Sequence, residues 1–232
     1  MTRRNPDVRG AAGRIPVSAV MYSACLVVAA GWYALQALHI TVASPPPLPA
    51  ERTARIAAFL ENFRTTVPQQ CGALLVASAG FAAFYVLTER TTSIIDRPWP
   101  ARMCRLGATL FIAAQLIQLG GYRLLYDTSP TKGRDPDADL VTLQLVDAID
   151  DALELGAFTL LAAGMLGLGL SSHATRAARP WSRSSTFTGL IYLALAGAMA
   201  AAAWTAVDVL LIVGGTIAAP VWALTLARAT RE

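Results

Sequence analysis

The sequence predicts an all-α, polytopic membrane protein: a bundle of six transmembrane helices with both ends of the chain in the cytoplasm. Three observations predict this fold. Hydrophobic residues make up 55% of the 232 residues and charged residues only 15%, whereas a soluble domain carries about a quarter charged residues. Apolar runs of membrane-spanning length recur along the chain. Basic residues gather in alternate connecting segments, as expected for a multi-pass protein of the cell membrane.

Each apolar run is long enough to cross a bilayer core of about 30 Å, which takes about 20 helical residues. The predicted spans are residues 17–38, 69–88, 104–126, 140–170, 187–204 and 206–227. They form one domain, residues 17–228, which follows a basic cytoplasmic tail of residues 1–16. The first run exceeds the roughly 7–15 residues of a signal-peptide core, so we expect it to remain as a helix. A very tight turn joins the last two spans, and Pro220 is expected to kink the final one.

A further helix is predicted in the first outer loop, after a proline-rich break at residues 44–49. Apolar residues recur at helical spacing between residues 51 and 67, with polar residues between them. They are Ile56, Phe59, Leu60, Phe63 and Val67. This pattern is typical of an amphipathic helix that lies in the membrane interface.

The distribution of basic residues predicts the orientation. Thirteen arginines fall in the N-terminal tail, the 89–105 and 173–183 loops and the C-terminus, against six basic residues in the alternate segments. The basic-rich side is expected to be cytoplasmic. Eleven of the fifteen acidic residues lie on the opposite, outer side. The net charge of +4 is therefore a topology signal, and no nucleic-acid partner is predicted.

Four acidic residues form a stripe on the fourth span: Asp147, Asp150, Asp151 and Glu154. Their spacing of i, i+3, i+4 and i+7 places them on one helix face. One interpretation is the water-facing start of a helix, where acids favour the positive end of the helix dipole. The other is an acidic site at the outer mouth of the bundle, because ionisable residues within spans tend to be functional.

Polar residues of other spans are expected at the same outer level. They are Gln36, His39, Gln69, Gln70, Gln115, Gln118, Tyr122, Arg123 and Asp208. The inner halves of the spans contain almost only apolar and small residues. This asymmetry predicts a polar pocket that opens outward and is closed on the inner side. For any single glutamine, the simpler interpretation is that its side chain forms a hydrogen bond between helices.

Arg123 is predicted to pair with the acidic stripe, through Asp147, Asp150 or Glu154. The third and fourth spans are consecutive, so their outer ends meet. Bidentate guanidinium–carboxylate geometry suits a partly dry site.

The sequence predicts no cofactor and no metal site. The motif Asp150-Asp151-x-x-Glu154 is superficially similar to the aspartate-rich motif of isoprenoid enzymes, but the second acidic motif of those enzymes is missing. The acidic loop at residues 135–139 lacks the glycine and glutamate of a calcium loop. The two histidines, His39 and His173, are predicted on opposite sides of the membrane, and the three cysteines at different depths, so we expect no disulfide.

The general plan resembles the uncharacterised six-helix membrane proteins of actinobacteria that are labelled as domains of unknown function. The resemblance rests on the short final pair of spans, on the ending Pro220-Val-Trp-Ala-Leu-Thr-Leu-Ala-Arg228 and on the long first outer loop. It implies a bacterial membrane protein and carries over no activity and no site residues.

Three functional hypotheses follow. The first is a non-enzymatic protein of the bilayer whose outward pocket binds a cation or a small amphiphile. The second is a lipid- or isoprenoid-modifying enzyme with Asp150, Asp151 and Glu154 as candidate catalytic acids, one of them protonated near neutral pH. The third is a membrane subunit or scaffold without chemistry. The candidate ligand-binding residues are Asp147, Asp150, Asp151, Glu154, Arg123, Tyr122, Gln118, Gln115, Asp208 and His39. The sequence leaves the oligomeric state open.

Overall fold

The computed structural model describes residues 16–42, 52–92, 95, 97–127, 136–171 and 178–230, and its regular elements in these ranges are all helices. They are α1 (Val17–Val42), α2 (Arg52–Thr91), α3 (Trp99–Asp127), α4 (Pro136–Ser171), α5 (Ala178–Ala200), α6 (Trp204–Val213), the π-helical segment η3 (Gly214–Ala218) and α7 (Ala219–Ala229). This confirms the all-α fold class.

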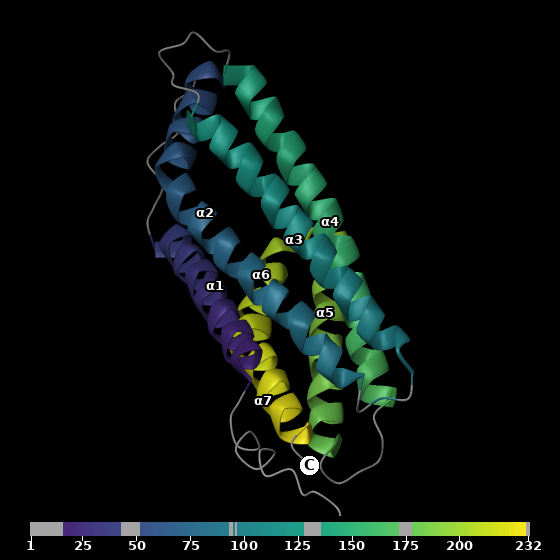
Figure 1. Cartoon of the computed structure of the whole chain (residues 1–232). Coiled ribbons are helices and arrows are strands. Elements are labelled where there is room, and N and C mark those ends of the chain that lie inside the picture. The colour runs from purple at the N-terminus through teal and green to yellow at the C-terminus, as the bar shows by residue number, and fades with distance from the viewer. Residues whose placement is uncertain are drawn as a thin grey trace, which may run out of the picture.

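The helices run up and down along a common axis, with α6, η3 and α7 following one another as a single segment (Figure 1). The described chain begins and ends at the same end of the bundle, which we call the terminus end. At the opposite end, the start of α2, the end of α3 and the start of α4 extend together beyond the other helices (Figure 1). We call this the projecting end.

Five stretches are long and apolar enough to cross a membrane: Val17–Leu35, Thr66–Thr91, Trp99–Leu124, Asp137–Ser171 and Trp204–Ala229. They coincide with five of the six predicted spans. The remaining span corresponds to α5, whose first half is rich in serine and threonine. Many large apolar side chains are exposed on the bundle surface, which a soluble monomer rarely tolerates. The chain is thus a helical bundle of membrane type, while the number of crossings and their orientation stay predictions.

The structure differs from the sequence prediction at the first outer loop. Residues 52–91 form one continuous helix of 40 residues with Pro68 inside it, so the separate interfacial helix is wrong. The physical reason is that its apolar stripe has helical partners: Leu60 and Val67 form a small core with Tyr122 and Leu143 of the projecting α3 and α4. A helix of 40 residues, such as α2, is about 60 Å long, which is twice the thickness of the hydrocarbon core of a bilayer.

Glycines of α4 allow close contact with the neighbouring helices. A Cβ on Gly164 would lie 2.8 Å from the backbone oxygen of Pro100 on α3, and one on Gly167 would lie 2.5 Å from the Trp99 ring. A Cβ on Gly169 would overlap Thr186 of α5. Small residues serve this purpose where helices meet in a bilayer. Gly197 of α5 differs, since a Cβ added there would meet no neighbouring atom within 4 Å.

The final span is irregular immediately before Pro220. The π-helical segment Gly214–Ala218 occupies this place. Proline has no backbone N–H to donate to the preceding turn, and a π-turn is one way to absorb the lost hydrogen bond. The predicted tight turn before this span is present at residues 201–203, where Ala202 takes a φ of 51°.

Polar groups also lie inside the terminus half of the bundle, contrary to the expectation of apolar and small residues alone. Trp222 Nε1 donates to Ser185 Oγ over 3.0 Å. The hydroxyls of Ser184 and Thr225 are 2.7 Å apart. Short hydroxyl side chains fit between closely packed helices and bond across them. Their small size explains why the sequence pattern resembles an apolar one.

Candidate functional site

A polar cluster forms between α3 and α4. Gln115 of α3 is only 1% exposed, and its Nε2 donates to Glu154 Oε1 of α4 over 2.6 Å. Glu154 itself is partly buried. Hydrogen bonds to carboxylates are short and strong, so this contact fixes the two side chains across the α3–α4 interface.

A second set of contacts lies farther toward the projecting end. Gln118 Nε2 donates to the Tyr122 hydroxyl over 2.9 Å, and that hydroxyl donates to Asp147 Oδ1 over 3.3 Å. The ring of Phe63 from α2 packs edge-on against the Tyr122 ring, with centroids 4.8 Å apart. The acidic stripe of α4 therefore meets Gln115 and Tyr122 of α3, which the sequence placed at the same level.

Two buried oxygen atoms of the cluster lack hydrogen-bond partners among the described residues. One is Oε1 of Gln115 and the other is Oδ1 of Asp150. Asp150 is 5% exposed, so it does not face water. Leaving a buried polar atom unsatisfied costs about 1–3 kcal/mol, and such atoms in a native structure call for an explanation.

Tyr33 of α1 belongs to the same region, and the sequence analysis missed it. It interacts electrostatically with Glu154, Asp150 and Asp208. The signal that could have identified Tyr33 is its distance along the chain from the terminus end. Tyr33 is 17 residues from Pro16, and Glu154 is likewise 17 residues from Ser171. Helices rise equally per residue, so the two residues lie at similar depth.

The remaining predicted site residues are less closely involved. Asp208 is exposed at the start of α6, and Asp151 is partly exposed on α4. Arg123 is exposed and interacts electrostatically with Cys71; its pairing with the acidic stripe stays a prediction. The side chain of His39 lies outside the described residues, as does His173. Within the described ranges, no group of three or more His, Cys, Asp or Glu side chains is arranged to hold a metal ion.

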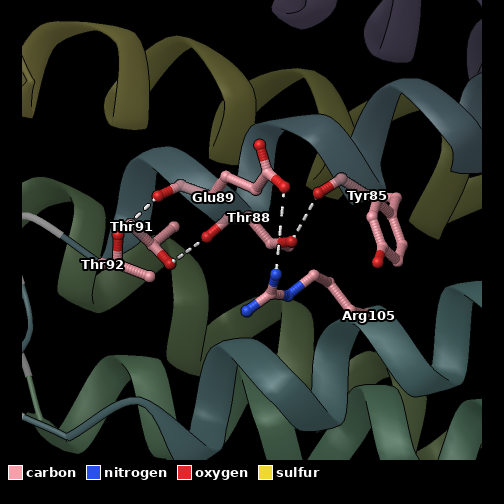
Figure 2. Close-up of polar contacts among 6 residues, drawn as sticks. All are labelled: Tyr85, Thr88, Glu89, Thr91, Thr92 and Arg105. Atoms are coloured by element: carbon pink, nitrogen blue, oxygen red, sulfur yellow. Dashed lines mark hydrogen bonds and ion pairs between the residues drawn. The ribbon is translucent and has the colours of Figure 1, made fainter.

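A different polar arrangement occurs where α2 and α3 meet at the terminus end (Figure 2). Arg105 Nη1 lies 3.9 Å from Glu89 Oε1, and its guanidinium stands 5.9 Å from the centre of the Tyr85 ring. The hydroxyls of Thr88 and Thr91 donate to backbone carbonyls of their own helix. Here an acid and a base face each other, so no uncompensated acidic site arises.

Comparisons with protein families, with curated proteins and with solved structures gave no match for this chain. The resemblance to six-helix membrane proteins of unknown function therefore stays an expectation.

Proposed function

We propose that this chain is a multi-pass protein of the cell membrane that binds a small cation at the Gln115–Glu154 cluster. The observation that carries the proposal is the pair of buried, unpartnered oxygens on Gln115 and Asp150. Carboxylate and amide oxygens are the ligands that hard cations prefer. A bound cation would satisfy both oxygens and offset the repulsion among acids three and four residues apart.

We further propose that the projecting end faces the outside of the cell. The arginine-rich segments lie in the tail, at residues 89–105 and 173–183 and at the C-terminus, and the helix ends that they flank lie at the terminus end (Figure 1). Basic segments favour the cytoplasmic side. A reporter active only outside the cell should give a signal when inserted at residue 132 and none when fused to residue 232; the reverse pattern would refute the orientation.

Cation binding is tested on the purified full-length protein in detergent. Sodium, potassium, magnesium and calcium chloride are titrated at constant ionic strength while the melting temperature is followed. We expect at least one cation to raise the melting temperature in a saturable way, since ligands that bind only the native state stabilise it. Glu154→Gln should abolish the rise, whereas Asp137→Asn, an exposed acid of the same helix, should retain it.

Two outcomes would refute the site. One is the absence of a saturable rise with every cation tested. The other is an equal rise in the wild-type protein and in Glu154→Gln, which would indicate binding elsewhere.

A further inference from the structure

A partly open pocket of about 50 Å³, called the cavity below, lies between the helices of the bundle. Residues of α1, α2, α3, α4, α5, α6 and η3 line it. Five of the lining residues are aromatic: Tyr33, Phe81, Phe111, Phe158 and Tyr192. A single water needs only about 10–15 Å³ on this scale. The cavity therefore has room for a group of several non-hydrogen atoms.

Four of these aromatic rings form a continuous row across the bundle. The ring centroids of Phe81 and Phe111 are 4.1 Å apart, those of Phe111 and Phe158 are 5.6 Å apart, and those of Phe158 and Tyr192 are 5.9 Å apart. The hydroxyl of Tyr192 lies 3.4 Å from that of Tyr22 on α1. The row thus places four aromatic rings around one small, mostly apolar space.

The cavity is connected to the acidic cluster by helix geometry. Phe111 is four residues before Gln115 on α3, and Phe158 is four residues after Glu154 on α4. Residues four apart lie on the same face of a helix, about 6 Å apart along its axis. The Gln115–Glu154 hydrogen bond thus stands about one turn above the Phe111–Phe158 contact. Tyr33 joins the two, since it lines the cavity and interacts with Glu154 and Asp150.

We infer that the cation bound by this protein is a small alkylammonium ion, with its charge next to Glu154 and its methyl groups in the aromatic cavity. The inference rests on the proposed cation site and names its ligand class. A bare metal ion would use the oxygens alone and leave the aromatic space unused. An alkylammonium ion is attracted both by the carboxylates and by the ring faces, which is how aromatic cages recognise quaternary ammonium groups.

The test compares tetramethylammonium, methylammonium and sodium chlorides on the full-length protein in nanodiscs, by calorimetric titration at matched ionic strength. We expect both organic cations to bind the wild-type protein at least about tenfold more tightly than sodium, as a desolvated cation–π contact implies. This comparison uses the wild-type protein alone. Sodium binding as tight as that of both organic cations would overturn the inference.

A matched pair of variants locates the binding. Phe158→Leu removes a cavity ring and should weaken tetramethylammonium binding about tenfold or more, with sodium binding unchanged. Phe84→Leu removes an equally buried ring that does not line the cavity, and it should leave both affinities unchanged. Equal tetramethylammonium affinity in the two variants would overturn the inference.

The two proposals fail in distinguishable ways. Sodium or calcium binding that depends on Glu154, together with no binding of either organic cation, would overturn the alkylammonium inference and leave the cation site standing. No binding of any cation would overturn both.

Discussion

Both ends of this bundle hold polar groups in apolar surroundings, but the two ends differ in how these groups are paired. At the terminus end, the contacts join neutral groups or opposite charges, as in Trp222–Ser185 and Arg105–Glu89. The buried atoms left without a partner in the described part of this end are neutral, on Ser78, Trp181 and Thr188. At the projecting end, one such atom belongs to a carboxylate, that of Asp150.

Packing along α4 also changes between two of its glycines. Near the terminus end, a Cβ on Gly164 would meet backbone atoms of α3 at 2.8 Å. Eight residues nearer the projecting end on the same helix, a Cβ on Gly156 would meet only Leu110 Cδ1, at 3.7 Å. Along α4, packing is therefore close at Gly164 and looser at Gly156, two residues from Glu154, where the cluster also has unsatisfied acceptors. Natural proteins accept such local costs where function requires them.

The largest expected effect tests this packing difference directly. Gly164→Ala should destabilise by about 3 kcal/mol, because the added methyl overlaps backbone that cannot move aside easily. Gly156→Ala should be neutral or stabilising by about 0.5–1 kcal/mol, since alanine favours a helix interior over glycine. Denaturant or thermal unfolding in detergent measures both changes. Equal effects would show that the two regions are packed alike.

The next effect probes the neutral polar contacts of the terminus end. Ser185→Ala should destabilise by about 1–2 kcal/mol, because it leaves the buried indole N–H of Trp222 without its acceptor. Thr159→Ala is the control: its hydroxyl donates to Leu155 O on an exposed face of α4, and its loss should change stability by less than about 0.5 kcal/mol. A Ser185→Ala protein as stable as the control would mean that the terminus end does not depend on this bond.

Much of the fold could be predicted because the bilayer imposes length and apolarity on each span. The spans starting near Val17 and Trp204 are examples, since uninterrupted apolar sequence leaves few alternatives to a helix. The interfacial helix of residues 51–67 was wrong for a tertiary reason. Its apolar stripe suits a membrane surface and a protein partner equally, and only the projecting ends of α3 and α4 decide between them.

The candidate site could be predicted only in part. The i, i+3, i+4, i+7 spacing correctly placed the acids on one face, and the Gln115–Tyr122 face of α3 does meet them. The unpartnered oxygens could not be predicted, because satisfaction of a hydrogen bond depends on side-chain orientation. Tyr33 was overlooked because a tyrosine within an apolar run looks like a core residue until the depths of the helices are compared.

A smaller effect of opposite sign at two positions of α4 tests the acidic cluster. Asp150→Asn should stabilise by about 0.5 kcal/mol, because it removes a charge from a face crowded with acids. Asp137→Asn should destabilise by a similar amount, about 0.5 kcal/mol, since Asp137 lies in the first turn of α4, where negative charge favours the helix dipole. Melting temperatures in low salt measure both. Destabilisation by Asp150→Asn would show that this carboxylate is already well compensated.

The smallest effect concerns the ion pair shown in Figure 2. The side chain of Glu89 is 61% exposed, that of Arg105 is 27% exposed, and their closest atoms are 3.9 Å apart. Water screens such a pair, and holding two long side chains in place costs entropy, so exposed pairs contribute about 0–1 kcal/mol. Glu89→Gln should therefore lower stability by less than about 0.5 kcal/mol.

The loss of stability in Glu89→Gln should become smaller still in high salt, where exposed charges are screened over a few ångströms. We expect Arg105 to keep its position near the Tyr85 ring in this variant, because that contact does not involve Glu89. A larger loss that persists in high salt would show that the terminus end, like the projecting end, holds a charge that water does not screen, and the contrast between the two ends would then be one of degree.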